Sequence, residues 1–322
     1  MNQDCSTLQL SESMIPGCIL SFKVNANLAP NRSPLKYVVE SQIGHGKFAQ
    51  VYLCCKEQHT EVLKFVDKTH FGAFKNRRGS RLTLQDEAAV MAGLDHVGIL
   101  SLYHAFDTNT HTVLALQWAP GGDLLHSLLE HGPFDEAGAS VSFLEICDAV
   151  NFLHIHHIVH RDLKPDNILL MSKNRSCSMP KITDFGLAIQ TFHDQDCITM
   201  CGTPLYMAPE LWRRPTQSIA TTCNLCYGNA VDMWSLGIIL YVILSCETPF
   251  ETSSDHPDDV NPDDIIHGRY CFDGQIWASI SKNAQELVTK LMCVNPSERL
   301  AANQVPEHQW CLIKKVDELS CT

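Results

Sequence analysis

The hydrophobic positions divide the chain into a strand-like first part and a helical second part. From residue 37 to about 63, apolar residues alternate in short runs separated by glycine and polar turns, which predicts β-strands. Similar runs return at Ile99–Phe106 and Thr112–Trp118, and Glu87–Leu94 has the spacing of a helix. The first part is therefore predicted to be rich in strands and to contain one important helix.

After Gly121 and Gly122 the period changes to that of helices. Apolar residues between Phe143 and Leu153 step by three and four positions, and those between 233 and 243 do the same. In the second stretch the intervening residues are mostly apolar too, so we expect a helix that is buried on every side. A further helix is marked near 287–292. A strand-rich lobe followed by a helical lobe predicts an α+β fold with a ligand cleft between the lobes.

Two polar stretches lack a sustained period. Residues 1–34 contain three prolines and are predicted to be a disordered tail, and Asp255–Asp264 is predicted to be an acidic loop. The longest apolar run, Leu236–Leu244, has nine residues, against the roughly 20 that a membrane-spanning helix needs. No secretory signal precedes Phe22. We therefore expect no membrane contact and a location in the cytoplasm, the nucleus or both.

The composition excludes several classes of protein. The 322 residues are 45% hydrophobic and 19% charged, which is a globular balance. The net charge of −12 argues against direct binding of nucleic acid through phosphate contacts. The 15 cysteines are odd in number and are expected to be reduced thiols. Cys223 and Cys226 have metal-ligand spacing, but a lone pair without a second one is a weak zinc signal.

A glycine-rich turn lies between two strand-like runs at residues 43–51. Glycines let the backbone approach a ligand closely and direct N–H groups at phosphate oxygens. Taken alone, this turn is more typical of a plain hairpin than of a phosphate-binding loop. Lys64 closes an apolar strand 13 residues further on, and taken alone it is typical of a lysine whose stem lies along an apolar surface.

The next motifs decide between these alternatives. A His-Arg-Asp motif at 160–162, extended to Asn167, is followed by Asp-Phe-Gly at 184–186 and Ala-Pro-Glu at 208–210. Five motifs in this order resemble the signature set of the eukaryotic protein kinase family. The resemblance covers about residues 37–312 and implies the bilobal kinase fold. It implies an N-lobe at 35–116, a hinge at 117–122, a C-lobe at 123–312 and a short tail at 313–322.

The resemblance assigns chemical roles to individual residues. Asp162 would accept or orient the proton of the substrate hydroxyl, and Lys164 would neutralise charge on the transferred phosphoryl group. Asn167 and Asp184 would bind Mg²⁺ through hard oxygen atoms. All the charged catalytic groups are present, whereas kinases that act only as scaffolds usually lack at least one. An active enzyme is therefore favoured over a pseudokinase scaffold.

The resemblance also implies an ATP site. Lys64 would hold the α- and β-phosphates and pair with Glu87, for which Asp86 is the alternative. Leu116 would be the gatekeeper. Ala49, Val62 and Gln117 depart from the residues that are usual in the family, but none of these changes removes a catalytic charge. The full predicted set is Ile43, Gly44, His45, Gly46, Lys47, Phe48, Ala49, Gln50, Val51, Val62, Lys64, Glu87, Gln117, Ala119, Asp123 and Leu169.

Two stretches resemble serine/threonine kinases rather than tyrosine kinases. They are Lys164 after the His-Arg-Asp-Leu run and the Cys-Gly-Thr-Pro run that contains Thr203. Thr203 would hydrogen-bond Asp162 and Lys164, although it could instead be a simple phosphosite. Asp123 would hold the ATP ribose and an arginine three residues before the target. Asp166 would be a second acid in the groove that binds the substrate peptide, or it is only a solvated charge.

The subgroup is indicated by runs near residues 267–299, which resemble the calmodulin-dependent-kinase group. Within that group, residues 181–186, the long loop Met171–Pro180 and the long stretch Lys68–Leu84 resemble the effector checkpoint kinases. Those relatives carry a forkhead-associated domain before the kinase, for which about 36 residues are too few. Few residues follow Leu312, so control by calmodulin is not expected.

The regulation implied by the resemblance centres on Thr199. A phosphate there, added by an upstream kinase or by self-phosphorylation, would pair with Arg161 and order the segment from Asp184 to Glu210. The alternative is an exposed loop threonine. The segment from Glu210 to Asp232 is about ten residues longer than is usual in the family. The excess is Trp212–Cys226, for which an idle surface loop is favoured over a docking element. The expected cofactors are ATP and Mg²⁺, and the expected partners are protein substrates.

Overall fold

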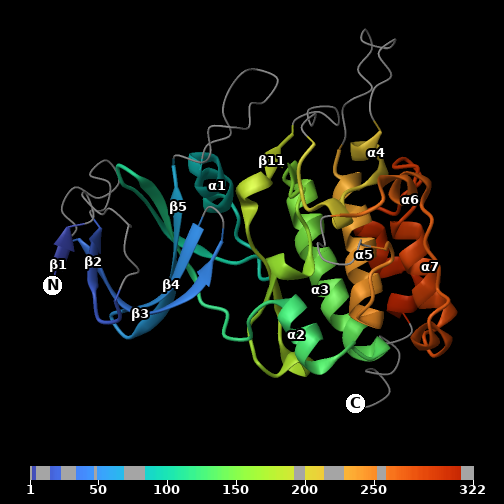
Figure 1. The fold of residues 1–322 in the computed structure, drawn as a ribbon, viewed down its shortest axis with the longest axis horizontal. Helices are drawn as coiled ribbons and strands as arrows, with labels where there is room; N and C mark the ends of the chain where they lie inside the picture. Colours follow the sequence, from blue (N-terminus) through green and yellow to red (C-terminus); the bar gives the residue numbers. More distant parts are fainter. Residues whose placement is uncertain are drawn as a thin grey trace, which may run out of the picture. The chain divides into compact units, whose positions relative to one another are not determined.

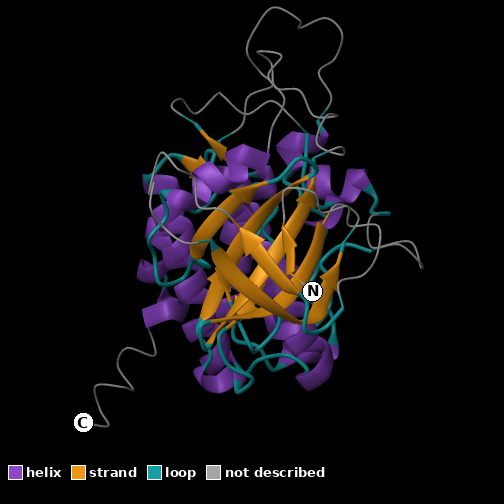
Figure 2. Cartoon of the chain, turned by 90° about the vertical axis from the view of Figure 1, so that its left-hand side faces the viewer, coloured by secondary structure: helices purple, strands orange, loops and turns teal. Residues whose placement is uncertain are grey.

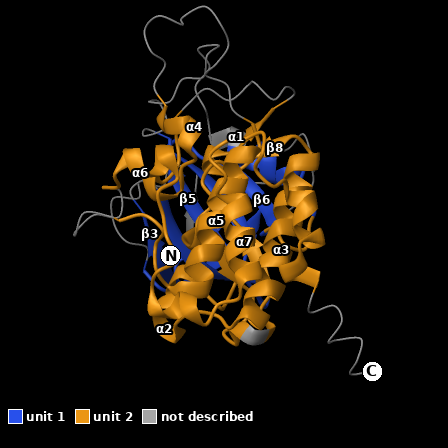
Figure 3. Cartoon of the chain, turned by 90° about the vertical axis from the view of Figure 1, so that its right-hand side faces the viewer, with its two compact units in different colours: residues 1–95, 100–118 blue, residues 96–99, 119–322 orange. Residues whose placement is uncertain are grey.

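The computed structural model describes residues 2–4, 15–22, 34–46, 49–68, 84–191, 200–213, 228–251 and 259–312. By its contacts the chain divides into two units, coloured separately in Figure 3. The first unit contains Met1–Asp95 and Leu100–Trp118, and the second contains His96–Ile99 and Ala119–Thr322. In the described residues, no helix is both long enough and apolar enough to span a bilayer.

The first unit is built on a seven-stranded sheet, drawn in orange in Figure 2, with the order β1-β2-β3-β4-β5-β7-β6. β1 pairs with β2 in parallel, and every other neighbouring pair is antiparallel. One α-helix, α1 (Leu84–Ala92), occurs in the described part of this unit. The strands are β1 (Asn2–Asp4), β2 (Ile19–Phe22), β3 (Leu35–His45), β4 (Ala49–Lys56), β5 (His59–Asp67), β6 (Leu102–Asp107) and β7 (His111–Gln117).

Alternation along β5 gives the sheet two different faces. Leu63 and Phe65 join a buried cluster that is rich in aromatic rings. Val62 and Lys64 point to the opposite face, because successive side chains of a strand alternate. The side chains of β5 that the sequence predicts to bind ATP therefore lie on the sheet face opposite the aromatic cluster.

The N-terminal segment corrects the prediction of a disordered tail over residues 1–34. Within it, β2 pairs along its length with β3. Leu20 and Phe22 of β2 are 0% and 2% exposed, and the Phe22 ring stacks on Phe106 at 4.4 Å between centroids. The prediction is wrong for these residues because a strand of only four residues is too short to show a hydrophobic period.

The second unit is mainly helical (Figure 1). α5 is buried from Val231 to Ser245, which confirms the prediction of a helix enclosed on every side. α3 and α7 pack against it. The helices are α2 (Leu124–His131), α3 (Glu136–Ile155), α4 (Pro209–Trp212), α5 (Ala230–Ser245), α6 (Pro262–His267) and α7 (Lys282–Leu291). Two short hairpins pair β8 (Ile158–Val159) with β11 (Ile189–Gln190) and β9 (Ile168–Leu170) with β10 (Pro180–Ile182).

The sequence predicts that residues 35–116 form one lobe that ends at the hinge. The structure differs, because residues 96–99 belong to the second unit. The amide of Ile182 donates to the carbonyl of Gly98 over 2.8 Å. Nζ of Lys181 donates to the carbonyls of Val97 and Ile99 over 2.7 and 3.1 Å. A Cβ on Gly98 would lie 2.9 Å from the Ala149 side chain of α3. Glycine at this position therefore permits close packing of the segment.

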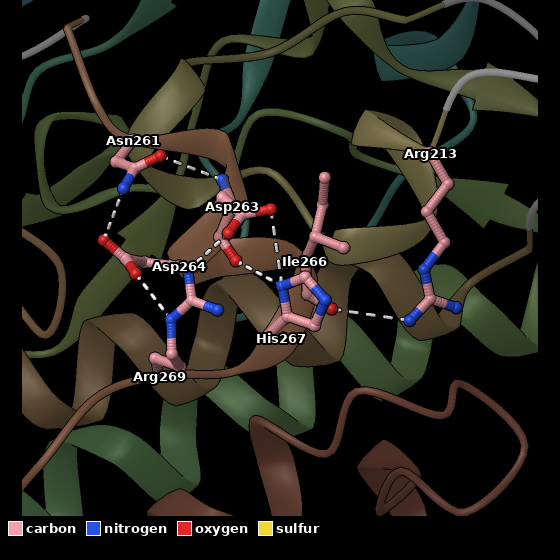
Figure 4. Close-up of polar contacts among 7 residues, drawn as sticks. All are labelled: Arg213, Asn261, Asp263, Asp264, Ile266, His267 and Arg269. Atoms are coloured by element: carbon pink, nitrogen blue, oxygen red, sulfur yellow. Dashed lines mark hydrogen bonds and ion pairs between the residues drawn. The ribbon is translucent and has the colours of Figure 1, made fainter.

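The acidic stretch that was predicted as a loop up to Asp264 begins α6 at its end. Asn261 caps this helix by accepting the amide of Asp263 over 3.1 Å, and Pro262 occupies the first turn. Figure 4 shows Arg269 bound to Asp264 over 2.8 Å and to Asp263 over 2.6 Å. The local cap therefore overrides the loop expected from charge and proline.

Candidate active site

In the first unit, the sheet face of Lys64 carries the side chains predicted for nucleotide binding. Lys64 lies opposite Val51 on β4, and Val62 lies opposite Leu116 on β7. Nζ of Lys64 donates to Oε1 of Glu87 on α1 over 3.1 Å, and the Glu87 side chain is buried. The pair expected between these two residues is therefore present, and its cation is held in place on the sheet.

The glycine-rich segment forms the end of the β3–β4 hairpin. Gly44 lies opposite Val51 and His45 opposite Gln50, so the predicted turn is confined to the residues after His45. The amide of Gly46 donates to the carbonyl of Ala49 over 2.8 Å. The side chain of Ile43 is exposed. Lys47 and Phe48 lie outside the described residues.

In the segment around residue 117, which the sequence predicts to be the hinge, backbone groups form hydrogen bonds with other backbone groups of the chain. The amide of Gln117 donates to the carbonyl of Ser101 over 3.0 Å. In the second unit, the carbonyl of Ala119 accepts the amide of Gly122 over 3.4 Å. Gln117 is directly opposite Glu61 in the sheet. These contacts fix the backbone of the segment in each unit.

In the second unit, Asp162 lies at the centre of the candidate catalytic site. Its Oδ1 accepts both the amide and the hydroxyl of Thr203, over 2.9 and 2.8 Å. Its Oδ2 lies 3.1 Å from Nδ2 of Asn167 and 3.2 Å from Nζ of Lys164. Lys164 also donates to the hydroxyl oxygen of Thr203 over 2.7 Å. The structure therefore brings four of the predicted catalytic and metal-binding residues into one hydrogen-bonded group.

Glycine is required immediately before Thr203. Gly202 has a φ of +110°, and a Cβ there would lie 2.6 Å from the carbonyl oxygen of Arg161. Both the backbone conformation and the close approach exclude a side chain. The contact places Thr203 beside Asp162.

The β9–β10 hairpin carries the two residues predicted to bind Mg²⁺. Asn167 immediately precedes β9, and Asp184 lies two residues beyond β10. The amide of Thr183 donates to the carbonyl of Asn167 over 3.0 Å, so both residues lie at the same end of the hairpin. Nδ2 of Asn167 is used by Asp162, which leaves its Oδ1 as an acceptor. A carboxylate and an amide oxygen fit Mg²⁺, which keeps its remaining positions for water and phosphate.

The backbone before Asp162 is anchored by Asp232, a residue that the sequence analysis missed. This fully buried carboxylate on α5 accepts the amides of His160 and Arg161, each over 2.9 Å. Nε2 of His154 lies 2.9 Å from its Oδ2. Burial alone would raise the pKa of Asp232, but the hydrogen bond and charge of His154, together with the charge of His160 and the amide of Arg161, lower that pKa below its usual value. A single acid in an otherwise apolar helix was the available signal.

A second missed contact joins two motifs that the sequence analysis noted separately. Both terminal nitrogens of Arg299 donate to the carboxylate of Glu210, over 2.8 and 2.9 Å. The Arg299 side chain is fully buried and lies over the Trp234 ring at 5.3 Å. This pair fixes the end of the segment that starts at Asp184.

Asp123 and Leu169 are brought together as neighbours across an isolated β-bridge. Oδ1 of Asp123 caps α2 by accepting the amide of His126 over 2.7 Å. A Cβ on Gly121 would lie 2.4 Å from the carbonyl of Ser172, so glycine is required there too. The cap occupies one oxygen of Asp123 in this arrangement.

Several predicted features lie outside the described residues. They are Thr199, the pair Cys223 and Cys226, and most of the stretch after Trp212. Arg161, the predicted partner of a phosphate on Thr199, has a φ of +68°. Its Nε donates to the carbonyl of Leu187 over 2.6 Å. That contact already ties the arginine to the segment after Asp184.

Comparison with known proteins agrees with this geometry. The family model described as "Protein kinase domain" matches residues 37–311. The probable serine/threonine-protein kinase fhkD of Dictyostelium discoideum is 34% identical over 85% of this chain and 37% of its own length. The serine/threonine-protein kinase H1 homolog of Danio rerio is 33% identical over 89% of this chain and 64% of its own. The calcium/calmodulin-dependent protein kinase type 1 of Macrobrachium nipponense is 34% identical over 85% and 74%.

The coverage of these relatives is unequal. The chain spans little more than a third of the Dictyostelium kinase and just under two thirds of the Danio kinase. The similarity is confined to the matched region of each relative.

Proposed function

The chain belongs to the protein kinase domain family and is of the serine/threonine type, and on this premise we propose that it transfers the γ-phosphoryl group of ATP to serine and threonine hydroxyls of proteins. The observation that carries the proposal is the carboxylate of Asp162, held by Thr203, Asn167 and Lys164. Members of this family generally use ATP and Mg²⁺.

The contacts of Asp162 suggest how it acts. Its two oxygens are engaged by four hydrogen-bond donors, so its orientation is fixed before a substrate arrives. A substrate hydroxyl takes the place of one donor, and Lys164 is the natural one to leave because it turns to the transferred phosphoryl group. Asp162 then orients the hydroxyl and accepts its proton.

Other residues would hold the nucleotide and metal. Lys64, fixed by Glu87, would bind the α- and β-phosphates, while Asn167 and Asp184 would bind Mg²⁺. When bound, Mg²⁺ neutralises phosphate charge during transfer. Lys64, Glu87, Asn167 and Asp184 all lie within the described ranges.

The substrate preference is an arginine three residues before the target. Asp123 supports it, because the cap on α2 uses its Oδ1 and leaves Oδ2 as an acceptor. Asp166 is an exposed acid near the catalytic loop and adds negative charge. A charge-assisted contact with a guanidinium would then select the basic residue.

The cellular role that we assign is checkpoint or stress signalling in the cytoplasm or nucleus. The run at residues 181–186 and the long loop Met171–Pro180, which resemble the effector checkpoint kinases, support it. Activation would follow phosphorylation of Thr199 by an upstream kinase or by the chain itself. Calmodulin has no place in this proposal.

The proposal is tested with Asp162→Asn in a phosphorylation assay with ATP, Mg²⁺ and arginine-containing peptides. Turnover should fall by about two to four orders of magnitude, because a base or orienting group is lost. Nucleotide affinity should stay near that of the parent protein. Asp273→Asn, the same change at an exposed position, should be neutral. Nucleotide binding by the parent protein without any turnover would favour a scaffold instead.

A further inference from the structure

A cavity of about 750 Å³ lies in the second unit, away from the residues of the candidate catalytic site. It is bounded by the first half of α3, by the segment before that helix and by the loop Met171–Pro180. Phe134, Val141, Glu145 and Met179 line it. Its volume falls within the range of about 300–1,000 Å³ that is typical of ligand sites.

One wall of the cavity is held in place by Arg175. Its two terminal nitrogens donate to the carbonyls of Gly132 and Pro133, each over 2.7 Å. Its guanidinium also lies over the Phe134 ring at 4.2 Å. The loop is closed on itself by the amide of Ser172, which donates to Oγ of Ser178 over 2.9 Å. These contacts give the long loop one defined position against the segment before α3.

The lining combines apolar surface with acidic groups. Val141 is 50% exposed and Met179 is 37% exposed, so both offer apolar contact area. Glu145 is half-buried, and its carboxylate has no hydrogen-bond or ion-pair partner among the described residues. Burial raises the pKa of Glu145. Asp135 is a second acid of the lining, and its Oδ1 is used to cap α3.

The charge of the lining is complementary to a cation. Among the described residues that line the cavity, Arg175 alone has a basic side chain, and two carbonyls and a ring already engage it. The half-buried carboxylate of Glu145 is therefore available to a bound group. Hydrogen bonds donated by that group would offset the cost of burying Glu145. A protein with a net charge of −12 also attracts basic partners.

We propose that this cavity, which we call the α3 groove, docks an extended segment of a protein substrate. That segment presents an arginine or lysine to Glu145 and flanking apolar side chains to Val141 and Met179. The proposal deepens the kinase function proposed above, because docking outside the catalytic site raises the local concentration of the target hydroxyl. The interaction itself does not depend on catalysis and is measured separately.

The binding test uses labelled twelve-residue peptides that lack serine, threonine and tyrosine. Each carries two leucines and one arginine, whose position is moved along the peptide, and a matched set has glutamine in place of arginine. Fluorescence polarisation with the full chain should show at least one arginine peptide with a Kd of roughly 10–100 µM, in the range of weak, transient contacts. Its glutamine counterpart should bind about tenfold more weakly.

Two variants with matched controls localise the binding. Val141→Asp should weaken binding at least about tenfold, since it places a charge on the apolar floor. Ile155→Asp makes the same kind of change at a 65% exposed position near the end of the same helix and should be neutral. Glu145→Gln should weaken binding of the arginine peptide about tenfold and of the glutamine peptide less than about twofold. Glu130→Gln is its exposed control.

The kinetic test attaches the best peptide to a phosphorylatable peptide through a Gly-Ser linker. KM should fall by about tenfold with kcat unchanged, and Val141→Asp should abolish the gain. Failure of turnover in all samples would refute the kinase proposal while leaving the binding result standing.

Three outcomes would refute the proposal that the α3 groove docks a substrate segment. The first is the absence of measurable binding by every arginine peptide. The second is binding that survives both Val141→Asp and Glu145→Gln. The third is binding that appears only after residues 313–322 are removed, because the chain's own lysine-containing segment would then be the occupant.

Discussion

Replacing Asp232 by Asn perturbs the support of the catalytic loop while hardly changing side-chain size. The carboxylate serves three donors: Oδ1 accepts the amide of Arg161, and Oδ2 accepts the amide of His160 and contacts His154. An asparagine has one oxygen and one NH₂ group in their place. The less costly orientation keeps the oxygen at the Oδ2 position, so that the NH₂ group faces the amide of Arg161.

The expected loss follows from these contacts. A buried donor without an acceptor costs about 1–3 kcal/mol, and the two remaining hydrogen bonds weaken by about 1 kcal/mol each when the acceptor loses its charge. Asp232→Asn should therefore lower the free energy of unfolding by about 3–5 kcal/mol. This corresponds to a decrease in Tm of roughly 6–20 °C for a domain of this size. Activity should fall as well, because Arg161 is held at a φ of +68°.

Two measurements test this prediction. Thermal unfolding gives the Tm, and native-state hydrogen exchange gives the exchange rates of the amides of His160 and Arg161. Both amides should exchange faster in Asp232→Asn, because their acceptor is weakened or lost. Asp95→Asn, the same change at an exposed position, is the control. If Asp232→Asn melts within about 2 °C of that control, the loop does not depend on this carboxylate and the reasoning is wrong.

Three further predictions follow from other buried groups. Phe22→Ala should lower the free energy of unfolding by about 3–5 kcal/mol through lost burial and a residual cavity; urea unfolding measures it, with the exposed Ile15→Ala as control. Glu210→Gln should cost about 3–5 kcal/mol, because it leaves buried Arg299 without a counter-charge; an unchanged urea midpoint would contradict this. Burial, followed by the charge of Lys290, lowers the pKa of His308 below 6.5. The unfolded chain therefore binds more protons, and stability should fall as the pH drops through 6.5. His308→Gln should flatten that profile of unfolding free energy against pH.

The sequence predicted those features whose signal is local or fixed in order along the chain. The period of α3, the apolar character of α5 and the order of the motifs around Asp162 are of this kind. The pairing of Lys64 with Glu87 was also predictable, because the family resemblance links a strand to the helix that follows it. Each of these predictions needed only residues that are near in sequence or a motif that recurs.

The features that were missed depend on distant partners. β2 is four residues long, and its burial depends on the ring of Phe106, far along the chain. The role of Asp232 as an anchor of the catalytic loop is visible only once its two backbone donors, the amides of His160 and Arg161, are known. Arg175 looks like a surface residue of a long loop until the carbonyls of Gly132 and Pro133 are placed beside it. A hydrophobic pattern does not encode such partners, so only the structure shows them.

The anchor at Asp232 also has a consequence for the order in which the protein is made. The amides of His160 and Arg161 are 72 and 71 positions earlier in the chain than the carboxylate that accepts them. During synthesis the loop leaves the ribosome long before α5, so the left-handed conformation at Arg161 has no support at that stage. Contacts of such large sequence separation form late and slowly. The catalytic loop is therefore expected to be among the last parts to reach its native shape, and nascent chains that stop before α5 should carry its sequence without its geometry.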